Sequence, residues 1–337
     1  MRNHSPRISV RFGSAVVLFV GWLAGCTSAT DAPHASPPPG AGEHLIVLRQ
    51  GDLEVGLLPQ VGGRVVLLRH RSGPNLLKSD PAGWQPEAWP ELRANASWRS
   101  FNGHIYWVAP QSEWWSHQEL LPERAGRWWP PDPYLIFGDY EILEQTPVRL
   151  VLRGPPSPVS GLRLTKTVEL RADNVVWLAA EAENIRDTPV SWGLWSNTRF
   201  HGDTPFRVDL DGFAEEGIWY SHPEQFRGTV SPEGRWFTFD NKDAIGVAEP
   251  VANKAFMNVT SARAEAFFDG LVLEKAMPVT EAERIHPEHA SVEVFLQKHS
   301  NRADALLELE FHGPYETLPP GRSIRLEETW TLRPRQD

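Results

Sequence analysis

The feature that most constrains the fold of this chain is the alternation of apolar and polar residues along many short segments. Runs of six to ten residues with this pattern are separated by Gly and Pro; they occupy 44–49, 52–58, 63–69, 148–153, 162–170, 175–180, 291–296, 306–311 and 323–332. In 162–170, Arg163, Thr165 and Thr167 alternate with a largely apolar set, which is typical of an antiparallel strand with one solvated face. Period two therefore predicts β-strands through most of the chain.

Helical and repeated architectures are disfavoured by the same sequence. Its 30 prolines and its lack of long stretches with a 3.6-residue period argue against helical layers, and only residues 261–268 suggest a helical turn. No repeat of fixed period is evident, which disfavours a propeller or a solenoid. We therefore expect residues 43–337, about 295 residues, to form a single all-β domain, a large antiparallel β-sandwich.

The N-terminus has the layout of an export signal. Arg2, Arg7 and Arg11 precede a short apolar run, and small residues then lead to Cys26, the only cysteine of the chain. This arrangement resembles the lipobox of bacterial lipoproteins, so residues 1–25 are predicted to be a signal peptide and Cys26 the lipidated residue. The Pro-rich segment 26–42 is predicted to be a flexible tether. We expect a lipid-anchored protein of the cell envelope, at the outer membrane facing the periplasm if the host is Gram-negative.

Charge narrows the range of partners. Without residues 1–25 the chain keeps 30 basic and 43 acidic residues, a net charge of −13, and it contains no basic run. Nucleic acid is therefore an unsuitable partner, and the only membrane contact expected is through the anchor. A neutral ligand is not repelled by this charge. Oligomeric state is left open.

Tryptophan is concentrated in one segment that does not alternate. Eight of the 15 tryptophans lie between residues 84 and 129, in a stretch rich in proline that is expected to be mostly loop. Because carbohydrates stack C–H groups on indoles and bind amide and carboxylate groups through their hydroxyls, this segment predicts a sugar-binding cleft. A second interpretation is a satellite core beneath a long loop. The ligand-binding candidates are Asn102, Trp107, Gln111, Trp114, Trp129 and Asp132.

Two Trp–Trp pairs bear on this choice. Trp114 precedes Trp115 and Trp128 precedes Trp129; if these segments are extended, one member of each pair is exposed or lines a cleft. A further polar run follows a predicted strand and contains Asn197, Arg199 and His201. Arg199 is a candidate for binding a ligand hydroxyl or carboxylate, with a structural salt bridge as the alternative.

Several segments resemble the galactose-mutarotase-like superfamily. They are 59–66 (PQVGGRVV), 73–77 (GPNLL), 308–314 (ELEFHGP), 318–323 (LPPGRS) and 328–330 (ETW). More specifically, 102–111 (NGHIYWVAPQ), Trp114 and 129–132 (WPPD) resemble an uncharacterised bacterial branch of it, a domain of unknown function. The resemblance covers residues 43–337 and implies the large β-sandwich, or supersandwich, of that superfamily.

The resemblance also implies candidate catalytic residues. In mutarotases a His at the end of a comparable strand is the general acid and a late-strand Glu is the base, because ring opening needs both proton transfers. By chain order, His201 is the nearest acid and Glu308 or Glu293 the nearest base, although the Asn-His signature of aldose epimerases is absent. Such an enzyme would be an aldose 1-epimerase-like isomerase.

Other chemistry lacks support in the sequence. His286 and His289 lack zinc-protease spacing and are expected in a solvated loop, and no common hydrolase or nucleotide motif occurs. The sequence thus identifies no metal ligands and predicts no cofactor, and it leaves metal dependence open. Three functions remain: a carbohydrate-binding lipoprotein, which we favour, a sugar-processing enzyme that is epimerase-like or acts on polysaccharides, and a structural envelope lipoprotein.

Overall fold

The computed structural model describes residues 44–335, and these residues form two large antiparallel sheets. The predicted leader 1–25, the lipidation of Cys26 and the tether 26–42 lie outside the described residues and stay predictions. Within 44–335, no helix is long and apolar enough to cross a bilayer.

The first sheet has nine strands, in an order that mixes early and late parts of the chain. In spatial order they are β1 (Ile46–Gln50), β2 (Leu53–Leu58), β3 (Arg64–His70), β4 (His104–Ala109), β9 (Val190–His201), β18 (Leu306–Leu318), β17 (Val292–Lys298), β14 (Val251–Met257) and β11 (Trp219–Tyr220). The long strands β9 and β18 pair along most of their length at the centre of this sheet.

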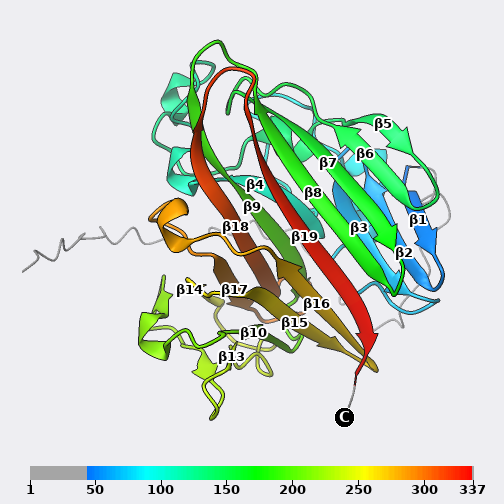
Figure 1. Cartoon of the computed structure of the whole chain (residues 1–337), viewed down its shortest axis with the longest axis vertical. Coiled ribbons are helices and arrows are strands. Elements are labelled where there is room, and N and C mark those ends of the chain that lie inside the picture. The colour runs from blue at the N-terminus through cyan, green and yellow to red at the C-terminus, as the bar shows by residue number, and fades with distance from the viewer. Residues whose placement is uncertain (1–43, 336–337) are drawn as a thin grey trace, which may run out of the picture. The chain divides into compact units, whose positions relative to one another are not determined.

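The second sheet has ten strands and lies on one side of β9 and β18 (Figure 1). In spatial order they are β12 (Thr229–Val230), β13 (Trp236–Thr238), β10 (Phe206–Asp209), β15 (Ala262–Phe268), β16 (Leu271–Met277), β19 (Ser323–Pro334), β8 (Val175–Asn184), β7 (Leu162–Arg171), β6 (Arg149–Arg153) and β5 (Glu141–Gln145). Buried aliphatic and aromatic side chains from both sheets form the core. The predicted all-β sandwich is confirmed.

The predicted strands are present, with ends that differ by a few residues. The helical turn expected at 261–268 is wrong, because Ala262–Phe268 is strand β15 and pairs on both sides, with β10 and β16. The alanines of this segment, Ala262, Ala264 and Ala266, favour a helix, but pairing with a strand on each side overrides that propensity.

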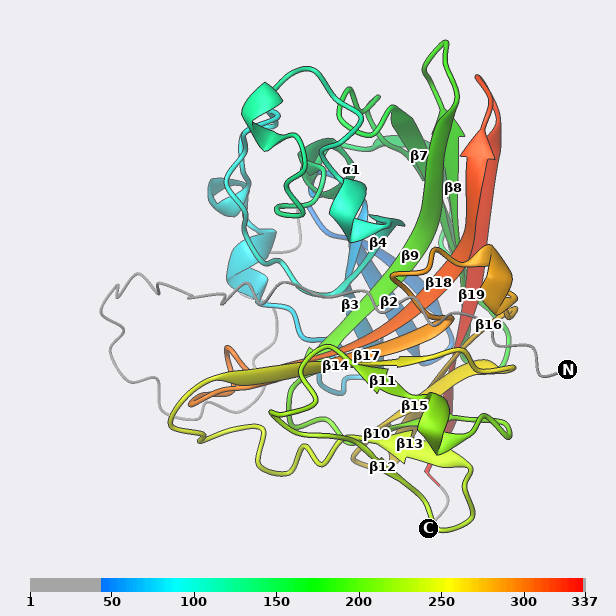
Figure 2. The same ribbon diagram turned by 90° about the vertical axis from the view of Figure 1, so that its left-hand side faces the viewer.

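The Trp-rich segment covers the opposite side of the first sheet. Figure 2 shows the part of the chain between β3 and β5 on one side of β4, β9 and β18, with β7, β8 and β19 on the other. Apart from β4, it contains the short helix α1 (Pro133–Phe137) and 3₁₀ turns, η1 (Pro81–Trp84), η2 (Pro86–Ala88), η3 (Gln111–Glu113) and η4 (Pro122–Arg124). Two more 3₁₀ turns, η5 (Glu215–Gly217) and η6 (Ala282–Arg284), lie later in the chain. The first sheet is therefore covered on both faces along β9.

Candidate functional site

Strand β9 carries polar side chains on both of its faces. Ser196 points toward the second sheet, because its hydroxyl donates to Glu328 of β19 at 2.9 Å. Successive side chains of a strand point to opposite faces. Trp195, Asn197 and Arg199 therefore point the other way, toward the Trp-rich cover.

The face of β9 that points toward the Trp-rich cover continues across four strands, because the strand register aligns its residues with those of β4, β17 and β18. Three cross-strand rows result: Trp107 with Trp195 and His312, Asn197 with Glu310 and Glu293, and Arg199 with Glu308. We call these eight residues of β4, β9, β17 and β18 the polar face. All of them are buried, and the most exposed, Glu308, keeps 7% of its surface.

An ion pair occupies one end of the polar face. Arg199 Nε lies 2.6 Å from Glu308 Oε1, and the guanidinium stands over the Trp107 ring at 5.3 Å from its centroid. Arg199 Nη1 also donates to the Ser100 hydroxyl at 3.3 Å. The structural salt bridge that was the alternative for Arg199 is thus formed.

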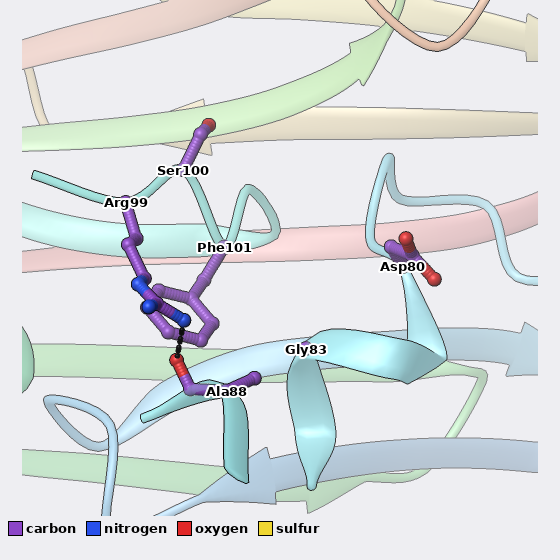
Figure 3. Close-up of a pocket in the computed structure, with 6 residues that line it drawn as sticks. All are labelled: Asp80, Gly83, Ala88, Arg99, Ser100 and Phe101. Atoms are coloured by element: carbon purple, nitrogen blue, oxygen red, sulfur yellow. Dashed lines mark hydrogen bonds between the residues drawn. The ribbon is translucent and has the colours of Figure 1, made fainter. Parts of the chain in front are cut away.

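A pocket of about 130 Å³ lies near this ion pair, since Ser100, which lines the pocket, contacts Arg199; Figure 3 shows the residues that line it. Its lining consists of Asp80, Gly83, Ala88, Arg99, Ser100 and Phe101. Arg99 Nη1 donates to the Ala88 carbonyl at 2.8 Å, which fixes the guanidinium at the pocket (Figure 3). Asp80 caps η1 by accepting from the Ala82 amide at 2.9 Å. Ser100 belongs both to the pocket lining and to the contacts of Arg199.

A second group of charges lies further along the polar face. Lys254 of β14 contacts both Glu293 and Glu310, and Asn197 Nδ2 donates to Glu310 at 2.6 Å. The carboxylates of Glu293 and Glu310 therefore share the single ammonium of Lys254 in a buried region. His289 Nδ1 also lies 2.9 Å from Glu293 Oε1. Burial raises the pKa of Glu310 to about 8, whereas the pKa of Glu293 is held well below its usual range by neighbouring His312 and Lys254 despite its burial.

The predicted indoles mostly pack against one another. Trp107 and Trp114 are buried with their rings edge to face at 5.4 Å, and the space between them and α1 is too small for a water molecule. Trp129 is 38% exposed and packs on Trp98 at 4.7 Å. Most of the Trp-rich segment is therefore arranged as the satellite core that was the second interpretation.

The three polar candidates from the same segment have local partners. Asp132 is buried, caps α1 through the Tyr134 amide at 2.9 Å and accepts a hydrogen bond from Ser157. Asn102 has a positive φ of 54°, and its carbonyl accepts from Arg64 at 2.8 Å. Gln111 is half-buried and lies 3.4 Å from the Trp128 carbonyl. Their role in ligand binding stays a prediction.

Two expectations about exposure are wrong. Trp114 and Trp115 are both buried, because Trp114 has helical backbone angles (φ −50°, ψ −30°) and the argument from extended alternation does not apply. The Trp128–Trp129 pair does have an exposed member, Trp128 at 51%. His289, expected in a solvated loop, is buried against Glu293.

The candidate acid and base are not brought together as a pair. Glu308 is bonded to Arg199, and the register partner of His201 on β18 is Leu306. Burial, with Arg302 and Lys78 nearby, lowers the pKa of His201 to about 4.

Sequence reasoning did not single out Lys254, Glu310, His312 or Ser100. A signal for two of them was present: Glu308 and Glu310 stand at alternate positions of the predicted strand 306–311, His312 continues that alternation just after it, and Trp195, Asn197 and Arg199 alternate in the same way. Polar residues repeating with period two in two strands mark one shared polar face when the strands pair.

Comparisons with known proteins identify the family and the fold of this chain. The model of a family described as a domain of unknown function, DUF4380, matches residues 44–333. No curated protein matches the chain. Solved structures show the same fold. A candidate aldose 1-epimerase from Escherichia coli K12 gives a TM-score of 0.52 at 14% identity, over 86% of this chain and 99% of the other.

Two further solved structures have a similar fold. The Slr1438 protein from Synechocystis sp. PCC 6803 gives a TM-score of 0.53 at 14% identity, over 92% of this chain and 100% of the other. A TPR-domain containing protein from Parabacteroides distasonis gives 0.51 at 14% identity, over 87% of this chain and 48% of the other. These likenesses and the family match confirm the mutarotase-like fold in an uncharacterised domain, as the sequence resemblance implied.

Proposed function

Because this chain belongs to the DUF4380 family, a domain of unknown function with a mutarotase-like fold, we propose that it binds a carbohydrate in the pocket beside the Arg199–Glu308 ion pair. The observation that carries the proposal is the composition of this pocket. One aromatic ring, Phe101, is combined with Asp80, Arg99 and Ser100 in about 130 Å³.

These groups match the two surfaces of a sugar ring. The C–H face of a pyranose packs on an aromatic ring, and its hydroxyls donate to carboxylates and accept from guanidinium groups. Binding pockets typically combine apolar walls with a few fixed polar groups of this kind. Arg99 is held by the Ala88 carbonyl, and Ser100 links the pocket to Arg199, so that the polar groups are positioned before a ligand arrives.

Location in the fold adds support. The fold neighbours include a candidate aldose 1-epimerase, and the Arg199–Glu308 pair stands on central strands of the first sheet. The chain carries a net charge of −10, which favours a neutral sugar over a phosphorylated one.

The enzyme alternative has weaker support from this geometry. With a pKa of about 4, His201 is neutral near pH 7 and holds no imidazolium proton to give to a ring oxygen. Glu308 is committed to Arg199. A binding role needs neither proton transfer, so we place it first.

The test is equilibrium binding of mono- and oligosaccharides to the full-length chain, by calorimetry and by tryptophan fluorescence. We expect saturable binding of one sugar class, and Arg99→Ala should weaken it at least tenfold. Arg93→Ala is the matched control, because Arg93 is exposed in the same segment and pairs with Glu91 at 3.3 Å. Circular dichroism verifies that each variant is folded.

Two outcomes would contradict the proposal. If Arg99→Ala binds the sugar as tightly as the parent protein, the ligand lies elsewhere, and Trp129→Ala then tests the half-exposed indole. If no sugar in a broad panel binds, the structural role becomes the leading function.

A further inference from the structure

Three buried side chains on and beside the polar face converge on one point. His289, Glu293 and His312 each offer a ligand atom, and these atoms all lie within 4.8 Å of one another. His289 Nδ1 is 2.9 Å and His312 Nε2 is 3.3 Å from the same oxygen, Glu293 Oε1. The three residues are at most 7% exposed.

From this arrangement we infer that His289, Glu293 and His312 form a binding site for one divalent transition-metal ion, of which Zn²⁺ is the type. The inference is independent of the proposed sugar pocket. The sequence identifies no metal ligands, because these three residues come from two separate segments and lack a recognisable spacing motif.

The distances are close to those of a coordination sphere. Zn²⁺ binds imidazole nitrogen and carboxylate oxygen at about 2.0–2.2 Å, so that two ligand atoms at the tetrahedral angle are separated by about 3.3–3.6 Å. The N···O separation of 3.3 Å for His312 lies in this range, and the separation of 2.9 Å for His289 is shorter, so that His289 would move outward by a few tenths of an ångström or bind at a narrower angle. Two imidazoles and one carboxylate are a ligand set that borderline divalent ions accept, with further positions left for other ligands.

Hydrogen bonding alone satisfies the cluster poorly. The Ala290 amide also donates to Glu293 Oε1, at 3.0 Å, so three nitrogens surround an oxygen with about two lone pairs. His312 Nε2 is buried and has no hydrogen-bond partner despite its 3.3 Å distance. A metal ion between the oxygen and the two rings would be bound by a lone pair of each ring nitrogen, and the Ala290 amide would keep its hydrogen bond to Glu293.

The surroundings would orient the ligands. Lys254 contacts Glu293 Oε2, which leaves Oε1 directed at the histidines. The His289 and His312 rings stack at 4.3 Å, and His312 stacks on Trp195 at 5.0 Å. Lys254 also contacts Glu310, which lies outside the three-residue cluster, so one ammonium is shared by the two carboxylates.

The experiment is Zn²⁺ titration of the full-length chain after removal of metal with EDTA, followed by calorimetry and elemental analysis. We expect one Zn²⁺ per chain, and His289→Ala or His312→Ala should weaken binding at least 100-fold. His286→Ala is the matched control from the same loop, because the His286 ring packs on Tyr315 and lies outside the three-residue cluster.

A second measurement covers variants that fail to fold. Co²⁺ replaces Zn²⁺ in the unmutated protein, and X-ray absorption reports its ligands; two imidazoles and a carboxylate are expected. The inference is overturned if no stoichiometric ion binds, if both ligand variants bind as the parent does, or if the Co²⁺ ligands are not imidazoles. The cluster is then a histidine–carboxylate hydrogen-bonded group only. None of these results depends on sugar binding.

Discussion

Replacing Lys275 with methionine should destabilise the fold more than any surface change, because it leaves a carboxylate stranded between the two sheets. Lys275 of β16 lies 3.1 Å from Glu328 Oε2 of β19, and both side chains are at most 1% exposed. Lys275 also donates to the Ser196 hydroxyl at 2.8 Å and the Leu309 carbonyl at 3.1 Å, both in the first sheet. One ammonium thus joins the sheets.

The magnitude follows from these contacts. Removing one partner of a buried ion pair costs about 3–5 kcal/mol. Methionine has a similar volume, so that little of the loss comes from a cavity, and the contact of the Lys275 ammonium with the Phe311 ring, 4.4 Å from its centroid, is lost together with the ion pair. We therefore expect Lys275→Met to lower the free energy of unfolding by about 4 kcal/mol, a large part of the roughly 5–15 kcal/mol typical of a folded protein.

A double variant separates the stranded charge from the lost contacts. Lys275→Met with Glu328→Gln removes the charge, and the new amide oxygen still accepts from Ser196 and Tyr106. We expect it to recover at least half of the loss. The assay is equilibrium unfolding in urea, followed by tryptophan fluorescence, with the midpoint compared at constant slope. The reasoning is refuted if Lys275→Met costs less than about 1 kcal/mol, the range of a surface ion pair, or if the double variant is no more stable than the single one.

Two further predictions concern Gly103 and His104, at the start of β4. Gly103→Ala should lower the free energy of unfolding by more than about 2 kcal/mol, because Gly103 has φ +69° and a Cβ there would lie 2.2 Å from the Val65 carbonyl oxygen. The control is Gly126→Ala, which has a similar φ of +73° but open space around the Cβ and should cost about 1 kcal/mol. Thermal or urea unfolding measures both, and equal losses would contradict the steric argument. Burial, with Lys275 and other cations nearby, lowers the pKa of His104 to about 3, below its unfolded value of about 6.5. The unfolded chain then binds the extra proton between these values, so stability is full above about pH 6.5 and falls toward pH 3, by about 2.7 kcal/mol from this group at pH 4.5. Urea unfolding of His104→Gln should show a shallower loss over that window, and an unchanged slope would exclude His104.

The strands could be predicted because a strand with one buried face has a simple signature. Residues 162–170 alternate, and β7 spans Leu162–Arg171 with alternating burial. The same rule fails for β9, where ten of the twelve residues from Val190 to His201 are buried and the other two are half-buried. Both faces of β9 are covered, by the second sheet and by the Trp-rich segment, and alternation carries no information about a cover that is distant in sequence.

The candidate site could be predicted only in part, for a similar reason. Arg199 and Glu308 were identified separately, but their pairing depends on the register of β9 against β18, which brings together residues more than a hundred positions apart. The Trp114–Trp115 prediction failed because it assumed extended backbone where the chain turns. Ser100 was missed because only the tertiary contact with Arg199 distinguishes it from other loop serines.

Charge balance, rather than burial, separates a structural network from a candidate site on β9. On the face toward the second sheet, one carboxylate, Glu328, meets one ammonium, Lys275. On the opposite face, Glu293 and Glu310 share the single ammonium of Lys254. A balanced pair is complete as it stands, whereas two carboxylates with one cation in a buried region require a proton or another positive group. Both networks are equally buried and flank the same strand. The first is complete as an ion pair that ties the sheets together, whereas the second is completed either by a proton on Glu310, whose pKa burial raises to about 8, or by the cation proposed above.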